Sequence, residues 1–226
     1  MANMYMWHEA QASRGCKEIA SCLFKFIKSI PSTVKHITCF TDNCGGQNKS
    51  QIIVKFWLYV VRTINIETVD HRFFCCGHSY NECDQDFGQI ELKKRRIKES
   101  IYIPEHWYDL VSSTSKKFIV VKMVDKDFID LESLQPHFKK SVPGIRQMQW
   151  LHFEKSSPDT LYFKHSAADG LEMFSEMSMK VKNCRGRQKQ FPKHLPTVKE
   201  KPVLSSKGKG PVRSNPIHTP NSSSIL

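Results

Sequence analysis

An alternation of strand-like and helix-like segments over the first 111 residues constrains the fold more than any other feature. β-Branched and aromatic residues mark strands at about 4–7, 36–41 and 71–76. Helical period or length marks the segments between them, at 15–30, 47–63 and 81–98, and a short helix begins at Pro104. Strands that alternate with helices form a mainly parallel sheet with covered faces, so the sequence predicts an α/β core.

The chain after residue 115 has a different pattern. Short strands are expected at 118–124, 148–153, 161–165 and 173–181, with a small helix near 128–134 and a hairpin turn at 156–159. From residue 183 onward there are nine Lys or Arg, one acid and six Pro, without a hydrophobic period. The expected organisation is a partial α/β core over 1–115, a small α+β region over 116–182, and a disordered basic tail over 183–226.

Positive charge is the main clue to a partner. The formal net charge is +12, and the tail with its nine bases and one acid carries +8 of it. In the rest of the chain, Lys93, Lys94, Arg95 and Arg96 form a run that Lys98 extends. Cations that neutralise phosphates release counterions, which favours nucleic acid, and DNA is the expected partner. Solubility alone is the alternative explanation.

The sequence argues against secretion and membrane insertion. The first thirty residues contain no basic segment followed by an apolar one, so the eight cysteines are not expected to form a secreted disulfide framework. The longest apolar run, 52–61, contains Lys55 and is too short to span a bilayer. We expect a soluble, intracellular protein, and the basic runs predict the nucleus.

Asp42 is the first candidate site residue, because it directly follows the strand at 36–41. In open α/β sheets, functional groups gather at the carboxyl ends of strands. Gly45 and Gly46 follow in a sharp turn, which lets another chain approach closely. The alternative is that Asp42 or Asn43 only makes an Asx-turn before the next helix. The pattern alone leaves both explanations open.

The helix predicted at 81–98 supplies further acids, Glu82, Asp84, Asp86 and Glu91. Asp84 and Glu91 share one helical face, whereas Asp86 points about 160° away from Asp84. Acids in the first turn also complement the helix dipole. This alternative is strong for Glu82 and Asp84 and weaker for Glu91, which lies near the middle.

Asp42, Asp84 and Glu91 together are candidate ligands for Mg²⁺ or Mn²⁺ and candidate catalytic residues. Hard cations prefer carboxylate oxygens and leave room for phosphate oxygens. Two such ions can activate a nucleophile and stabilise the leaving oxygen in phosphodiester chemistry. One strand acid with helix acids is too few, so at least one more carboxylate is expected from a neighbouring strand.

Other site chemistries compete with this one. A zinc site could use Cys75, Cys76, His78 and Cys83, with Cys44 nearby, but their spacing matches no paired-cysteine pattern. Cys44 as a nucleophile with His78 as its base is a further alternative. His78 could also orient a metal-bound water, contact a phosphate, or serve as a hydrogen bonder in a turn. Asn43 and Gln47 are further candidates, because they belong to the same block as Asp42.

Several blocks of sequence are distinctive when taken together: Met4–Glu9, Arg14-Gly15 with Glu18-Ile19 and Ser21-Cys22, Thr41–Lys49, and Gly77–Ser79 with Asn81-Glu82, Asp84, Phe87 and Ile90-Glu91. These blocks resemble an uncharacterised family of transposon-derived animal proteins. The block Asp-Asn-Cys-Gly-Gly-Gln-Asn is the most specific of them. The resemblance covers residues 4 to about 180 and implies an incomplete RNase H-like core of the DDE transposase or integrase type, with a mixed sheet and flanking helices.

By this resemblance, Asp42 is the acid of the fourth strand and Asp84 the acid of the helix, with Glu91 and Glu82 behind it. The strand that should carry the first acid has no counterpart, so this chain looks like a fragment beginning at the third strand. A preceding segment or an oligomer would have to supply it. The implied ancestral activity is metal-dependent DNA cleavage or strand transfer, incomplete or inactive here. The alternative is a non-enzymatic DNA- or chromatin-binding protein.

Overall fold

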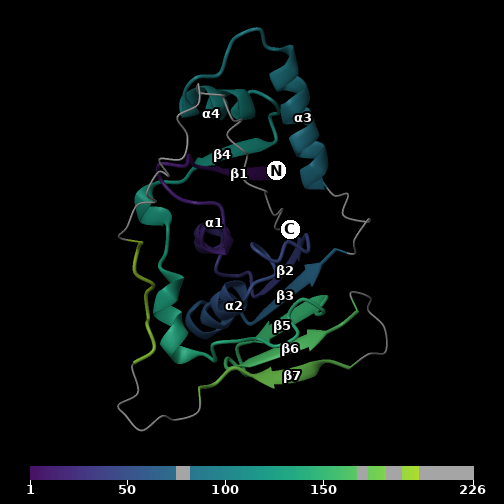
Figure 1. The fold of residues 1–226 in the computed structure, drawn as a ribbon, viewed down its shortest axis with the longest axis vertical. Coiled ribbons are helices and arrows are strands. Elements are labelled where there is room, and N and C mark those ends of the chain that lie inside the picture. Colours follow the sequence, from purple (N-terminus) through teal and green to yellow (C-terminus); the bar gives the residue numbers. More distant parts are fainter. Residues whose placement is uncertain (75–81, 167–172, 182–189, 199–226) are drawn as a thin grey trace, which may run out of the picture.

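A computed structural model describes residues 1–74, 82–166, 173–181 and 190–198, which form a mixed α/β protein (Figure 1). The helices are α1 (Cys16–Ser29), α2 (Gln51–Thr63), α3 (Glu82–Arg96) and α4 (Pro104–Ser112), with 3₁₀ turns η1 (Asp125–Asp127) and η2 (Leu131–His137). The strands are β1 (Ala2–Met6), β2 (His36–Thr41), β3 (Thr68–Phe73), β4 (Phe118–Lys122), β5 (Trp150–Glu154), β6 (Thr160–Lys164) and β7 (Ser175–Ser178). The expected α/β class is therefore confirmed.

The main sheet has five strands in the order β2-β3-β5-β6-β7. β2 and β3 are parallel, in a register that places Thr41 beside Phe73. β3, β5, β6 and β7 then follow in antiparallel pairs. The sheet is therefore mixed, as expected for the core. β2 and β3 form a parallel pair, whereas β5, β6 and β7 follow one another through short connections, which join antiparallel strands.

β1 does not join the main sheet. It pairs in parallel with β4 in a separate two-stranded sheet, from Ala2 beside Phe118 to Met6 beside Lys122. The segments expected to form a small region over 116–182 are therefore divided. β4 completes the sheet of β1, while β5, β6 and β7 extend the sheet of β2 and β3.

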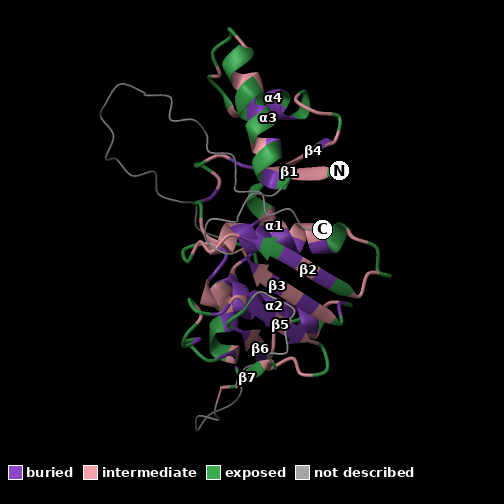
Figure 2. Ribbon diagram, turned by 90° about the vertical axis from the view of Figure 1, so that its right-hand side faces the viewer, coloured by how far each residue is buried: buried purple, intermediate pink, exposed green. Residues whose placement is uncertain are grey.

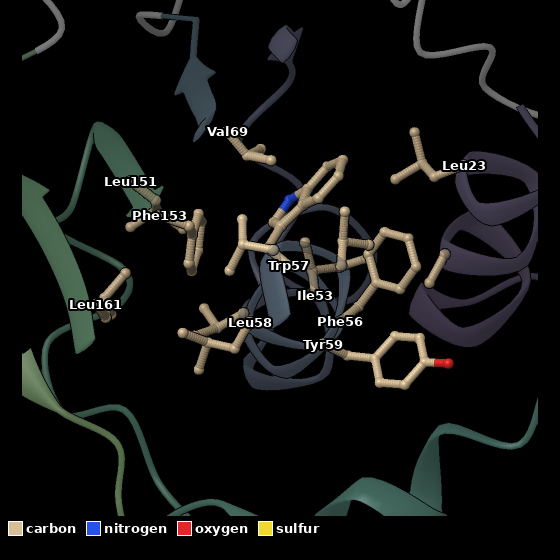
Figure 3. Packing of buried hydrophobic residues seen from close by; sticks show 14 of the residues in the cluster. Leu23, Ile53, Phe56, Trp57, Leu58, Tyr59, Val69, Leu151, Phe153 and Leu161 are labelled. Atoms are coloured by element: carbon tan, nitrogen blue, oxygen red, sulfur yellow. The ribbon is translucent and has the colours of Figure 1, made fainter. Parts of the chain in front are cut away.

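Helix α2 is the centre of the larger core. Every residue from Ile53 to Val61 is buried, including Lys55. Figure 3 shows why, since side chains leave α2 in all directions: Leu58 points toward β5 and β6, and Phe56 toward α1. A helix that is apolar all round must be enclosed. Ser50 caps its start by accepting a hydrogen bond from the backbone of Ile53.

Only one face of the main sheet packs against α1, α2 and η2. Val69, His71 and Phe73 of β3 lie on this inner face and are at most 1 % exposed. The residues between them, Asp70 and Arg72, lie on the outer face and are half-buried. Coloured by burial, α2 is mostly purple, whereas α3 shows much green (Figure 2).

A second core forms between the β1–β4 sheet and helices α3 and α4. It contains Met4 and Met6 of β1, Ile90 of α3, and Trp107 and Val111 of α4. A third, smaller cluster of Trp7, Ala12, Met123 and Phe128 follows β1 and β4. Two bonds tie the same part of the chain to α1: Lys25 pairs with Asp127 at 2.6 Å, and Ser21 accepts the backbone N–H of Ile129 at 3.1 Å.

Part of the expected basic tail packs on the main core. Phe191 stacks on Tyr59 of α2 with 6.1 Å between the ring centroids, and the Tyr59 hydroxyl donates to the Lys193 carbonyl at 3.1 Å. The composition of residues 183–226 predicted disorder and gave no sign of this contact. None of the helices in the described ranges combines the length and the apolar character that crossing a membrane requires.

Candidate functional site

Asp42 begins a polar loop, residues 42–50, at the carboxyl end of β2; we call it the Asp42 loop. Its Oδ1 accepts the backbone N–H of Cys44 at 3.2 Å and the Nδ2–H of Asn48 at 2.7 Å. The first bond closes an Asx-turn, which was the structural alternative for this residue. Both bonds end on Oδ1, and Oδ2 accepts none within the described part of the chain.

Asn43 fastens the Asp42 loop to the neighbouring strand. Its Nδ2 donates to the Phe74 carbonyl just beyond β3. Its Oδ1 accepts from Lys49 Nζ at 2.8 Å. Lys49 is only 4 % exposed, and its ammonium also lies 4.6 Å from the centroid of the Phe73 ring. The loop is therefore held at the ends of the parallel pair β2 and β3 by buried polar contacts.

A buried histidine lies directly beneath this loop. His71 Nδ1 accepts from Trp57 Nε1 at 3.1 Å, and its Nε2 lies 2.8 Å from Thr41 Oγ1. Because the indole can only donate, Nδ1 carries no proton and Nε2 donates to Thr41. Burial, and to a lesser extent the charge of Lys49, lowers the pKa of His71 to about 3. The imidazole is therefore neutral and orients the residue just before Asp42.

The other side of the loop is open. Gly45 and Gly46 are exposed, and a Cβ added at either would meet no atom of the described residues within 4 Å. Packing against this part of the chain therefore does not require glycine at these positions. Nearby in the sequence, Gln47 has a buried Oε1 that has no hydrogen-bond partner among the described residues. The loop thus joins an anchored carboxylate to exposed backbone that a ligand could approach.

The helix acids lie on another part of the fold. Asp84 and Glu91 are exposed on α3, whose buried side packs on the β1–β4 sheet and α4. No group of three His, Cys, Asp or Glu side chains gathers into a metal site among the described residues. Asp42, Asp84 and Glu91 all belong to the described residues, so these three side chains do not gather into such a group. A metal site that includes them stays a prediction and needs ligands from outside the described residues.

Asp86 has a structural role, in agreement with its expected direction away from Asp84. It is 5 % exposed, and its Oδ1 lies 2.5 Å from Lys117 Nζ just before β4. The same oxygen has no hydrogen-bond partner among the described residues, so the contact is an ion pair without hydrogen-bond geometry. It fastens the acidic end of α3 to the β4 sheet.

The basic run at the end of α3 divides into two groups. Lys93 donates to the Ser113 carbonyl and to its Oγ at 2.7 Å, and the Lys94 ammonium lies 5.0 Å from the Trp107 ring centroid. These two side chains attach α3 to α4. The remaining three, Arg95, Arg96 and Lys98, are all exposed and make no ion pair with any described residue.

The zinc and nucleophile hypotheses depend on residues outside the described ranges. Cys75, Cys76 and His78 all lie there, as does the Ser79 of the expected turn. Of their expected companions, Cys83 is buried and Cys44 is half-buried. His71, the buried histidine that supports the Asp42 loop, was not identified from the sequence. Its place between Val69 and Phe73 on the apolar side of a strand was the available signal.

The fold and the site define a class: a mixed α/β protein with an anchored, glycine-containing polar loop at the carboxyl edge of the parallel pair β2–β3. Residues 1–169 match the family described as Domain of unknown function (DUF7869), and the chain belongs to that family. The match runs from β1 through β6 and includes the Asp42 loop. No curated protein and no solved structure gives a match.

Proposed function

We propose that this protein binds nucleic acid, with DNA as the expected partner. The observation that carries the proposal is the group Arg95, Arg96 and Lys98, three solvent-accessible cations without an ion-pair partner among the described residues, in a chain of net charge +12. Arginine forms paired hydrogen bonds with phosphate, and each phosphate contact releases counterions.

The helix dipole accounts for only part of this charge. Lys93 and Lys94 already place two cations in the last turn of α3, where they complement the dipole and bind α4. Lys98 lies beyond the last residue of the helix, where the dipole effect has faded. A surplus of accessible charge at the free end of α3 therefore supports a polyanionic partner.

A salt series with labelled duplex DNA tests the proposal. Replacing Arg95, Arg96 and Lys98 by Ala should weaken binding and reduce the slope of log K against log salt by roughly 0.9 for each phosphate that is no longer neutralised. The matched control replaces Lys139, Lys140 and Arg146 by Ala, three exposed cations whose removal changes the net charge equally. Equal effects of both triple variants would reject a specific role for the end of α3.

A second candidate function is Mg²⁺- or Mn²⁺-dependent phosphodiester chemistry at Asp42, as an RNase H-like, transposase-derived origin would imply. The Oδ2 of Asp42 accepts no hydrogen bond from the described residues, and its place at the carboxyl end of a parallel strand pair favours this function. Asp84 and Glu91 would then contribute only together with ligands beyond the described residues. His78 is among the residues that could do so.

Direct Mn²⁺ binding and Mn²⁺-dependent nicking test this candidate. Asp42→Asn keeps an oxygen that can accept the bonds from Cys44 and Asn48, so the loop should stay folded while the metal loses a charged ligand. The parent should bind Mn²⁺ and the variant should bind it more weakly. Little or no nicking is expected from the chain as it stands, so nicking is compared in chains extended by the strands that carry the missing acid, where Asp42→Asn should abolish it. Identical Mn²⁺ binding by both chains would exclude Asp42 as a ligand. Nuclear localisation is a further expectation, to be checked by imaging tagged chains with and without residues 183–226.

A further inference from the structure

The outer face of the main sheet carries a row of side chains directly opposite one another on four strands. Phe40 of β2 is in register with Arg72 of β3, Arg72 with Trp150 of β5, and Trp150 with Lys164 of β6. Aromatic and cationic residues therefore alternate across the sheet. We call these four residues the cross-strand row. Adjacent strands lie roughly 4.8 Å apart, so like members of the row are about 10 Å apart.

The β2 end of the row presents an aromatic surface to solvent. Phe40 is 41 % exposed. Its ring stacks on Phe74, with 6.0 Å between centroids and 22° between the ring planes. A single exposed apolar side chain is ordinary on a protein surface. Two stacked rings that adjoin a guanidinium are a more specific arrangement.

Arg72 is held in place beside these rings. Its guanidinium carbon lies 3.6 Å from the centroid of the Trp150 ring and 5.9 Å from that of Phe40. Trp150 is fixed in turn, because its Nε1 donates to Asp70 Oδ1 at 2.6 Å. The same carboxylate oxygen is hydrogen-bonded to His152 Nδ1 at 2.8 Å. Trp150 and His152 therefore share Asp70, the acid that lies two residues before Arg72 on the outer side of β3.

The other end of the row, at Lys164, is covered by neighbouring side chains and supports the exposed end. Lys164 is 8 % exposed, and its ammonium lies 4.8 Å from the Trp150 ring and 4.5 Å from the Phe174 ring. Phe174 also packs on Trp150 at 5.1 Å. Exposure therefore increases along the row from Lys164 and Trp150, through half-buried Arg72, to Phe40. The accessible part combines stacked rings with a preorganised cation.

We infer that the exposed end of the cross-strand row binds single-stranded nucleic acid, with a base stacked on Phe40 and a neighbouring phosphate at Arg72. This rests on the proposed nucleic-acid binding but assigns it a second surface and a strand state. Stacking on an aromatic side chain requires an unpaired base whose face is free, which a duplex does not offer. An acidic peptide would contact the guanidinium but would leave the stacked rings unused.

Fluorescence anisotropy of the full chain with a labelled single-stranded oligonucleotide tests the inference. Phe40→Ala should weaken binding roughly 5- to 150-fold, the effect typical of losing one stacked base. Phe40→Trp should retain it. Ile119→Ala is the matched control, because Ile119 on β4 has the same 41 % exposure and lies outside the main sheet. It should leave binding unchanged, and circular dichroism should show all three variants folded.

An abasic oligonucleotide of the same length separates stacking from charge. The parent should bind it more weakly than the normal strand, whereas Phe40→Ala should bind both equally. If Phe40→Ala binds the normal strand like the parent while the triple variant of Arg95, Arg96 and Lys98 loses duplex binding, this inference fails and the proposed function stands. If the parent binds neither strand form, both fail. Equal competition by polyglutamate would overturn the inference, because the surface would then recognise charge alone.

Discussion

The two faces of the main sheet are made from the same strands but have opposite chemistry. Along β3, Val69 and Phe73 point inward and are almost completely buried against α2, while Asp70 and Arg72 point outward into a network of aromatic rings and hydrogen bonds. The apolar inward residues are held by packing, and the outward residues are held by specific polar and aromatic partners. The alternation of a single strand therefore separates the part that stabilises the fold from the part available for recognition.

A histidine on each face shows how the surroundings decide chemistry. On the inner face, burial lowers the pKa of His71 to about 3, and its partner Trp57 can only donate a hydrogen bond. On the outer face, the hydrogen bond with Asp70 raises the pKa of His152 above its ordinary value, against the opposing effect of burial. Identical side chains thus change pKa in opposite directions because one lacks an anionic acceptor and the other has one.

The largest expected difference between the faces is in packing. Phe73→Ala on the inner face should lower the free energy of unfolding by about 3–5 kcal/mol, because it leaves a cavity in a close-packed core. Phe40→Ala on the outer face should cost about 1 kcal/mol or less, since the ring is already 41 % exposed. Urea unfolding of both variants measures the contrast. Similar losses would mean that the two faces are equally buried in solution.

The next largest effect should be a loss of stability at acidic pH, caused by His71 on the inner face. The group is neutral in the folded chain down to a pKa of about 3 but takes up a proton near pH 6.5 when unfolded. The stability that neutral His71 contributes is therefore fully present above pH 6.5. As the pH falls below this value, the unfolding free energy should decrease by up to about 1.4 kcal/mol per pH unit. Unfolding free energies between pH 6.5 and 5 should show this slope in the parent and a smaller one in His71→Gln. The exposed His106 provides the control, and His106→Gln should keep the parent slope.

The outer face should respond to pH in the opposite direction and more weakly. Because the pKa of His152 is raised, its bond with Asp70 contributes fully below pH 6.5 and is lost as the pH rises through the raised pKa. Burial tends to raise the pKa of Asp70, but its bonds with His152 and Trp150 outweigh this and lower it, so the carboxylate stays charged in this window. The loss should be about 1 kcal/mol or less after solvent screening. His152→Gln should abolish it, and an unchanged profile would contradict the pairing.

The smallest effect is expected at the open side of the Asp42 loop, which packs against neither face of the main sheet. A methyl group at Gly45 would meet no atom within 4 Å, so Gly45→Ala should change the unfolding free energy by less than about 0.5 kcal/mol. A larger loss would show that the loop packs more tightly in solution. Loss of nucleic-acid or metal binding with unchanged stability would instead place a ligand above Gly45.

Local patterns predicted the elements of this fold better than their pairing. The strand at His36–Thr41 was predicted to the residue, and helix α2 ends at Thr63 as expected, because β-branched runs and apolar length are local signals. The pairing of β1 with β4 joins residues far apart in the sequence, and the sequence of neither strand indicates which strand it pairs with. The extension of the sheet by β5, β6 and β7 is undetectable for the same reason.

The candidate site was predictable to a similar depth. A strand that ends in Asp followed by two glycines placed Asp42 at the carboxyl edge of the sheet. The bonds that anchor it come from Asn48 and, through Asn43, from Lys49, whose burial depends on the packing of the whole loop. Likewise, the sequence showed a basic run of equivalent residues. Only the position of α4 separates Lys93 and Lys94 from the accessible cations that follow.

The pairing of β1 with β4 also sets an order of events during synthesis. Ala2 cannot meet Phe118 until the ribosome has added and released the intervening chain. At typical elongation rates of about 5–20 residues per second, β1 waits for roughly ten seconds without its partner. During that interval the apolar side chains of Met4 and Met6 lack their later neighbours Trp107 and Val111. A strand that emerges well before its partner thus stays unpaired for that time, and until β4 arrives it is a segment that a chaperone could bind.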